Sequence, residues 1–293
     1  MTRENIKKLC LIRFFCEKTF EMKLIEYLCN RKNQIDMKVT IIGAGNMGGA
    51  IARGLAKGHM VKVADITVSD PSVPILQSLK KDYPEMAVTG NNAEAVRDAE
   101  LIIVAVKPWL MQSVLSGLTW RKEQVLVSVA AGVTFEQLVE FTGNIGMTMF
   151  RLIPNTAISQ LESMTLIASY KATPEQEELL LGLFNEMGLA MLVPESQMGA
   201  ATAVTSCGIA YVLKYIQAAM QAGVEMGLYP KDAQRMVAQS VKGAAALILE
   251  NDTHPAVEID KVTTPGGITI KGLNELEHAG FTSAIVKAMK ASR

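Results

Sequence analysis

The chain has 293 residues, with 29 basic and 29 acidic side chains that give a formal net charge of zero. Hydrophobic residues make up 49% of the sequence and charged residues 20%, a globular rather than a disordered composition. Balanced charge gives no general attraction to nucleic acid or to an anionic membrane surface, so we predict neither as a partner.

Cysteine and histidine are too few and too scattered for a metal centre. The chain has four cysteines and three histidines, and no two cysteines form a CxxC pair. We therefore expect no metal site and no disulfide framework, and we expect reduced thiols in a cytoplasmic protein. No apolar run approaches the roughly 20 residues that a membrane-spanning helix needs.

Residues 1–36 differ from the rest of the chain. They are basic, hold three of the four cysteines and contain an aromatic cluster. Arg13 interrupts the apolar run Leu9–Phe15, so the stretch lacks the sustained core of a secretory signal. We interpret residues 1–36 as an extension outside the fold. An organelle-targeting peptide is the alternative, but it should be richer in Arg and Ser and poorer in acids.

Residues 37–194 alternate short apolar runs with helical stretches. The expected strands are Val39–Ile42, Ile66–Val68, Leu101–Val106, Val125–Val129, Met147–Leu152 and Met191–Val193. The expected helices are Met47–Lys57, Val73–Lys81, Leu110–Leu118, Phe135–Phe141 and Pro174–Met187. Strand and helix in repetition predict an α/β fold, with a Rossmann-type parallel sheet covered on both faces.

Residues 195–293 show almost no strand pattern. Two long helical runs, Met198–Met226 and Lys231–Leu249, dominate this part, and apolar residues of the first recur at spacings of three and four. We therefore predict an all-helical C-terminal domain that mediates self-association, as a dimer or a higher homo-oligomer, and contributes to substrate binding.

The first strand leads into a GxGxxG turn that predicts dinucleotide binding. Gly43 permits the tight turn, Gly45 lets the backbone approach a pyrophosphate, and Gly48 lets the helix pack closely on the strand. The helix that follows offers free N–H groups to the phosphates. The predicted contacts are Gly43, Ala44, Gly45, Asn46, Met47 and Gly48.

Asp70 follows the second strand, 27 positions after Gly43. An acid at this place can accept hydrogen bonds from the adenosine ribose, which favours NAD, whereas an arginine would favour NADP. The same Asp-Pro pair also suits the start of the next helix. Both interpretations stay open on the sequence alone.

Three further motifs carry a resemblance to pyrroline-5-carboxylate reductases. Ala105–Pro108 is similar to the family's AVKP, and Arg151–Thr156 is similar to its R-x-x-P-N-T. Val262–Thr269 resembles the signature V-[TS]-S-P-G-G-x-T, in which Pro-Gly-Gly is otherwise costly within a helical domain. With the glycine-rich turn, the resemblance covers essentially all of residues 37–293.

The resemblance implies hydride transfer from a reduced nicotinamide to the C=N carbon of Δ1-pyrroline-5-carboxylate, which gives L-proline. It implies NADPH as the cofactor, with NADH also possible, and a loop that faces the cofactor of a partner subunit. Thr269 is the implied catalytic residue, beside the substrate nitrogen, and Thr264, Gly266 and Gly267 are the implied substrate-binding residues. The implied additional cofactor contacts are Asn92, Ala105, Val106, Lys107, Pro108 and Asn155.

Each of these residues also has a plainer interpretation. Thr264 and Thr269 suit caps of an interhelical turn, and Asn92 and Asn155 suit helix caps or turns. Two alternative functions remain on the sequence alone, a β-hydroxyacid dehydrogenase-like oxidoreductase and a non-catalytic dinucleotide-binding sensor. Against the first, Lys214 lies six positions after Gly208, which does not match the G-x-x-x-K-x-x-N pattern of those dehydrogenases.

Overall fold

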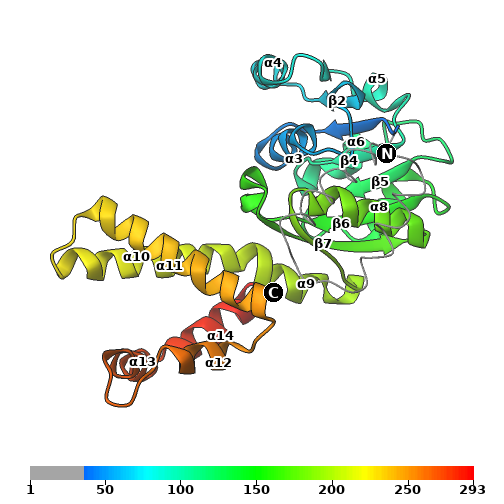
Figure 1. Ribbon diagram of the computed structural model, residues 1–293. Coiled ribbons are helices and arrows are strands. Elements are labelled where there is room, and N and C mark those ends of the chain that lie inside the picture. Colours follow the sequence, from blue (N-terminus) through cyan, green and yellow to red (C-terminus); the bar gives the residue numbers. More distant parts are fainter. Residues whose placement is uncertain (1–35) are drawn as a thin grey trace, which may run out of the picture.

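The computed structural model describes residues 36–293, which form a sheet-based domain followed by an elongated set of helices (Figure 1). The interpretation of residues 1–36 as an extension therefore falls, apart from Asp36, outside the described residues. No helix within the described range is long and apolar enough to cross a bilayer.

Eight strands form a single sheet in the order β3-β2-β1-β4-β5-β6-β7-β8. The strands are β1 (Val39–Ile42), β2 (Ile66–Ser69), β3 (Ala87–Thr89), β4 (Leu101–Val104), β5 (Val125–Ser128), β6 (Thr148–Ile153), β7 (Ser163–Tyr170) and β8 (Gly188–Leu192). The chain builds the sheet outward from β1 to β3 and then returns to add β4 on the other side of β1. This reversal creates a crevice at the carboxyl ends of β1 and β4, where open α/β sheets bind ligands.

Helices cover both faces of the sheet. They are α3 (Asn46–Lys57), α4 (Val73–Asp82), α5 (Asn92–Val96), α6 (Met111–Leu115), α7 (Phe135–Thr142) and α8 (Pro174–Asn185). Ile41 and Ile103 belong to one buried cluster, with α3, α4 and α8, whereas Ile102 and Val104 belong to a second, with α6 and α7. Alternate side chains of each strand thus enter opposite cores, which explains why the central strands are apolar throughout.

The prediction of a Rossmann-type fold is confirmed, but two strands were missed and one pairing is not parallel. β3 and β7 had no predicted counterpart, and β7 pairs antiparallel with β6. Only residues 154–162 connect these two strands, with the 3-10 helix Thr156–Gln160 among them. A parallel connection requires a crossover of a dozen or more residues, so this short link forces the antiparallel arrangement.

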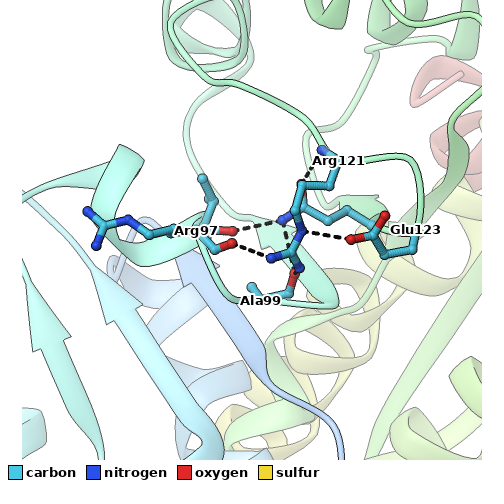
Figure 2. Close-up of polar contacts among 6 residues, drawn as sticks. Arg97, Ala99, Arg121 and Glu123 are labelled. Atoms are coloured by element: carbon cyan, nitrogen blue, oxygen red, sulfur yellow. Dashed lines mark hydrogen bonds and ion pairs between the residues drawn. The ribbon is translucent and has the colours of Figure 1, made fainter.

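Contacts from Arg121 (Figure 2) and from Gln124 hold together the loops that precede β4 and β5, at the amino ends of these strands. Nη1 and Nη2 of Arg121 donate to the carbonyl oxygens of Arg97 (2.5 Å) and Ala99 (2.9 Å), and Nε lies 2.9 Å from Oε1 of Glu123. Nε2 of Gln124, which is buried, donates to Ala99 O at 2.9 Å. These side chains therefore provide hydrogen-bond donors for carbonyl groups of the loop before β4. This loop lies at the amino ends of the strands, opposite the carboxyl ends where a ligand is expected.

The C-terminal helices extend away from the sheet as a long hairpin with smaller helices packed beside it (Figure 1). They are α9 (Met198–Thr202), α10 (Gly208–Glu225), α11 (Pro230–Asn251), α12 (Pro255–Lys261), α13 (Ile268–His278) and α14 (Phe281–Ala291). A π-helical turn, Ala203–Cys207, joins α9 to α10. The predicted helical run from Met198 is therefore continuous except for this turn, which lies where the helices leave the sheet.

An ion pair fixes the start of the helical part to the sheet. Arg151 on β6, with its side chain 8% exposed, donates through Nη1 to Oε1 of Glu195, and its guanidinium lies 5.9 Å from the centre of the Phe135 ring. The backbone N–H of Phe135 donates to the same Glu195 oxygen at 2.9 Å. Glu195 therefore joins β6, the first turn of α7 and the beginning of the C-terminal helices.

We predict that the two partners of this pair have unequal effects on stability. Glu195→Ala leaves the buried Arg151 guanidinium without its acceptor, so the free energy of unfolding should fall by about 3 kcal/mol. Arg151→Met should cost less, about 1–2 kcal/mol, because Glu195 is 39% exposed and still accepts from Phe135. Urea unfolding at a fixed protein concentration measures both changes.

Glu178→Ala is the matched control, since Glu178 is exposed on α8. It should change the free energy of unfolding by less than about 0.5 kcal/mol. An equal or larger loss in Arg151→Met than in Glu195→Ala would contradict the proposed asymmetry.

Candidate active site

The turn after β1 requires glycine at two positions for different reasons. Gly43 has φ +94° and donates its N–H to Ser69 O at 2.7 Å, and an added Cβ would lie 2.9 Å from Ala105 O. At Gly48 an added Cβ would lie 1.8 Å from Gly43 O. These two glycines hold β1, β2, β4 and α3 in close contact, as the sequence motif predicts.

Gly45 differs, because the protein itself does not require a glycine there. A Cβ added at Gly45 would have no heavy atom within 4 Å, and the φ of −63° lies outside the left-handed region that favours glycine. Gly45 is the N-cap of α3 and makes no side-chain cap hydrogen bond, so the first N–H groups of α3 face open space. We call the open space above Gly45 and the first turn of α3 the cradle. It suits a phosphate group, which a side chain at position 45 would exclude.

The carboxyl edge of the sheet holds a cavity of 1280 Å³. Eleven of the predicted cofactor contacts line it, namely Gly43, Ala44, Gly45, Asn46, Met47, Asp70, Asn92, Ala105, Val106, Lys107 and Pro108, whereas Gly48 and Asn155 do not. Lining residues that we did not predict include Arg53, Ala130, Ala131 and Thr156. Ala130 and Ala131 lie two and three residues after the end of β5. Their place just beyond the carboxyl end of a parallel strand could have identified them from the sequence.

The polar residues at the far end of this cavity hold one another in place. Asp70 accepts the N–H of Ala44 at Oδ2 (2.7 Å) and the N–H of Ser72 at Oδ1 (2.8 Å). Ser69 donates its hydroxyl to Oδ1 of Asn92 at 2.6 Å. Neither Asp70 nor Asn92 is a helix cap, which was the alternative role for each. The N-cap residue of α4 is Ser72 and that of α5 is Asn91.

Lys107 and Asn155 differ in their access to the cavity. The Lys107 side chain is exposed and its residue lines the cavity, whereas Asn155 is 7% exposed and does not. Asn155 Oδ1 accepts the N–H of Ala157, and Nδ2 donates to Thr205 O in the π-helical turn. The structure therefore places Asn155 as a link between the sheet and the helices, while its neighbour Thr156 reaches the cavity.

The segment predicted to bind substrate comprises the loop between α12 and α13, which contains Thr264, and the first turn of α13, which contains Thr269; both threonines are exposed. Gly266 has φ +72°, and an added Cβ at Gly267 would lie 2.6 Å from Thr264 Oγ1, so the loop requires both glycines. The N–H of Gly267 is not free, because it donates to Thr264 O at 2.9 Å. The N–H of Gly266 and the first N–H groups of α13 remain available, and α13 lacks a side-chain cap.

Glu258 holds α12, the helix that precedes this loop. Lys261 Nζ donates to Glu258 Oε1 at 2.7 Å, and the Thr253 hydroxyl donates to the same oxygen at 2.5 Å. These two hydrogen bonds, that of Lys261 first, hold the pKa of the Glu258 carboxyl below its ordinary value. The Thr264–Thr269 loop thus begins from an anchored helix.

Within one chain, the loop and the cavity do not meet. The Thr264–Thr269 loop contributes nothing to the cavity lining, and α12 and α13 lie at the helical end of the molecule, away from the sheet (Figure 1). Tyr211 on α10 holds the C-terminal end of α14 by hydrogen bonds with Ala288 O and Ser292 Oγ.

The helical part of the chain exposes far more apolar surface than it buries. Within 199–293, all of which the structure describes, Ala203 and Ala233 are the only apolar side chains that are buried. The exposed large apolar residues of α10 and α11 are Val212, Leu213, Tyr215, Val224, Met236, Leu247 and Leu249. A surface of this kind requires a covering partner, as an obligate homodimer interface provides.

Two family models match the chain. One, described as "Pyrroline-5-carboxylate reductase dimerisation", matches residues 195–293 and so supports a homo-oligomer. The other, described as "NADP oxidoreductase coenzyme F420-dependent", matches residues 38–132.

Similar solved structures share this fold. A Plasmodium falciparum pyrroline carboxylate reductase solved with NADP bound has 28% identity and a TM-score of 0.79, over 88% of this chain and 96% of that one. A Coxiella burnetii pyrroline-5-carboxylate reductase has 27% identity and a TM-score of 0.81, with the same coverage.

Curated relatives match over most of the chain. The pyrroline-5-carboxylate reductase of Methanosarcina acetivorans is 37% identical over 269 residues, which cover 88% of this chain and 97% of that protein. The Escherichia coli enzyme of the same name is 34% identical over 258 residues, 87% of this chain and 95% of that one. Pyrroline-5-carboxylate reductase 1 of Dictyostelium discoideum is 37% identical but longer, and the match spans 49% of it. The chain therefore belongs to the pyrroline-5-carboxylate reductase family.

Proposed function

We propose that this protein reduces Δ1-pyrroline-5-carboxylate to L-proline with NADH or NADPH, the final step of proline synthesis, as a homo-oligomer in the cytoplasm. The observation that carries the proposal is the open cradle at Gly45, beside a cavity of 1280 Å³ at the topological switch of the sheet.

The cofactor would lie along this cavity. The first N–H groups of α3 would hold the pyrophosphate, the adenosine end would lie near Asp70 and Asn92, and the backbone of Ala105–Pro108 would line the nicotinamide end. The bound cofactor supplies the hydride. Every other requirement of the reaction, namely orientation, exclusion of water and placement of the substrate charges, falls to the residues of the chain.

The Thr264–Thr269 loop would hold the substrate. The N–H of Gly266 and the first N–H groups of α13 suit a carboxylate, and the Thr264 hydroxyl can add a further donor. The Thr269 hydroxyl would hydrogen-bond at the ring nitrogen and so orient the C=N carbon toward the hydride. With a protonated ring nitrogen, the transferred hydride completes the amine of proline and no further proton donor is needed.

The histidines agree with a reaction that needs no strong acid. All three, His59, His254 and His278, lie within the described residues, and none lines the cavity. Reduction of a carbonyl would require a proton donor at the oxygen, whereas reduction of an iminium requires only that the ring be held in place. This supports an imine over a carbonyl compound as the substrate.

Gly45→Val should abolish cofactor binding while the fold survives. An added Cβ has no protein atom within 4 Å and the side chain enters the space above the turn, so the dissociation constant for reduced cofactor should rise about a hundredfold or more. Titration followed by nicotinamide fluorescence measures this constant. Gly146→Val, a similar change in an open loop, is the control and should bind as the unaltered chain does. Undiminished binding in Gly45→Val would remove the cradle from the site.

Thr269→Ala tests the substrate loop separately from the cofactor domain. Cofactor affinity should stay unchanged, while kcat/KM for pyrroline-5-carboxylate should fall about tenfold to a hundredfold, since one oriented hydrogen bond is lost. Thr269→Ser keeps the hydroxyl and should retain much of the activity. Absorbance at 340 nm follows the reaction, and full activity in Thr269→Ala would exclude the residue from the mechanism.

Mixed oligomers test whether the loop of one chain serves the cavity of another. A hybrid of Thr269→Ala and Gly45→Val chains contains one combination of cavity and loop that carries neither change. Purified hybrids should therefore regain up to about half of the unaltered activity, although each variant alone is impaired. Verified hybrids without activity would place the loop and the cavity of a working site in the same chain.

A further inference from the structure

We propose that Asp70 makes this enzyme prefer NADH to NADPH. The inference rests on the proposed function and extends it to the cofactor preference of this chain, whereas the family model over residues 38–132 is described for NADP and the Plasmodium falciparum relative was solved with NADP bound.

The Asp70 carboxylate is fixed at one place in the cavity. Oδ2 accepts the N–H of Ala44 at 2.7 Å and Oδ1 accepts the N–H of Ser72 at 2.8 Å, so the side chain cannot turn away without losing a bond. Ala44 belongs to the glycine-rich turn itself, which places the carboxylate beside the cradle. Each carboxylate oxygen has a second lone pair, so both can still accept a hydrogen bond from a ribose hydroxyl.

A ribose hydroxyl and a ribose phosphate meet this carboxylate with opposite results. The 2′-hydroxyl of NADH can donate to the carboxylate as a charge-assisted hydrogen bond. The 2′-phosphate of NADPH has no comparable donor and carries a charge of about −1.5 to −2, as phosphate monoesters do near neutral pH. A phosphate placed where the ribose hydroxyl would lie repels the Asp70 carboxylate, so NADPH binding would require displacement of Asp70 from Ala44 and Ser72.

No cationic side chain among the described residues forms an ion pair with Asp70. Arg53 lines the cavity, but its guanidinium donates to Gly49 O and lies 3.4 Å from Oδ2 of Asp82. Lys57 on α3 also lines the cavity, but no ion pair joins it to Asp70.

Asn92 provides no discrimination of its own. Its Oδ1 accepts the Ser69 hydroxyl at 2.6 Å, which leaves the amide nitrogen to donate toward the cavity. An amide N–H can donate equally to a hydroxyl oxygen or to a phosphate oxygen. Of the two residues, Asp70 is therefore the one that discriminates between a ribose hydroxyl and a ribose phosphate.

Equilibrium binding of the two cofactors to the complete protein tests the proposal. Titrations followed by nicotinamide fluorescence should give a dissociation constant for NADH that is about tenfold or more below that for NADPH. Raising the ionic strength should weaken this difference, because salt screens the repulsion of the phosphate. Tighter binding of NADPH by the unaltered chain would overturn the proposal.

Two variants separate the charge of Asp70 from its anchoring role. Asp70→Asn keeps an acceptor but removes the charge, and should shift the NADH-to-NADPH affinity ratio toward NADPH by about tenfold or more. Pro71→Arg leaves the Asp70 anchor intact and adds a cation beside it, and should shift the ratio in the same direction. Asp98→Asn, the control, makes the same charge change at an exposed position ahead of β4 and should leave the ratio unaltered.

The outcomes distinguish this inference from the function on which it rests. If Asp70→Asn weakens both cofactors equally and Pro71→Arg changes neither, Asp70 is a structural anchor and the preference is refuted. If the unaltered chain binds neither reduced cofactor, the proposed function itself fails. If both cofactors bind and support turnover but with equal affinity, the function stands and only the inference about Asp70 falls.

Discussion

The backbone of Gly43 determines how the candidate site is built. Its N–H donates to Ser69 O at the end of β2, and the space that a Cβ would fill is taken by Ala105 O after β4. Three parallel strands thus converge at one residue, which only glycine can occupy at φ +94°. Because the strands end together, Ala44, Asp70 and Lys107 come from distant parts of the sequence to the same cavity.

The helical part of the chain follows a different constraint. A hairpin of two long helices, joined to the sheet through Glu195 and the π-helical turn, buries few of its own apolar side chains. Burial against another chain stabilises such a surface at about 25 cal/mol for each Å² removed from water. We therefore expect association to stabilise this domain. It also offers a physical reason for the proposed substrate loop to lie far from the cavity of its own chain.

Some residues have roles that their sequence motifs did not reveal. Arg151 and Asn155 belong to one motif, yet both connect the sheet to the helical domain, one through Glu195 and the other through Thr205 O. The sequence allowed Asp70 to be either a helix cap or a ribose contact, and the structure shows that it anchors the glycine-rich turn and lines the cavity. These roles depend on partners 26 to 50 residues away, which local patterns do not encode.

The sequence by itself determined the strands at the centre of the sheet, the glycine-rich turn and the change to helices near residue 195. Those features arise from local pattern, because buried parallel strands are continuously apolar and tight turns require glycine. Tertiary structure alone decided the addition of β3 and β7, the antiparallel pairing of β7, and the true caps at Ser72 and Asn91. Strand β7 carries Ser163, Thr165 and Ser169 among its apolar residues, and it becomes a strand because β6 and β8 supply hydrogen bonds on both sides. Pairing of that kind depends on neighbours brought together by the whole fold, so no window of sequence contains it.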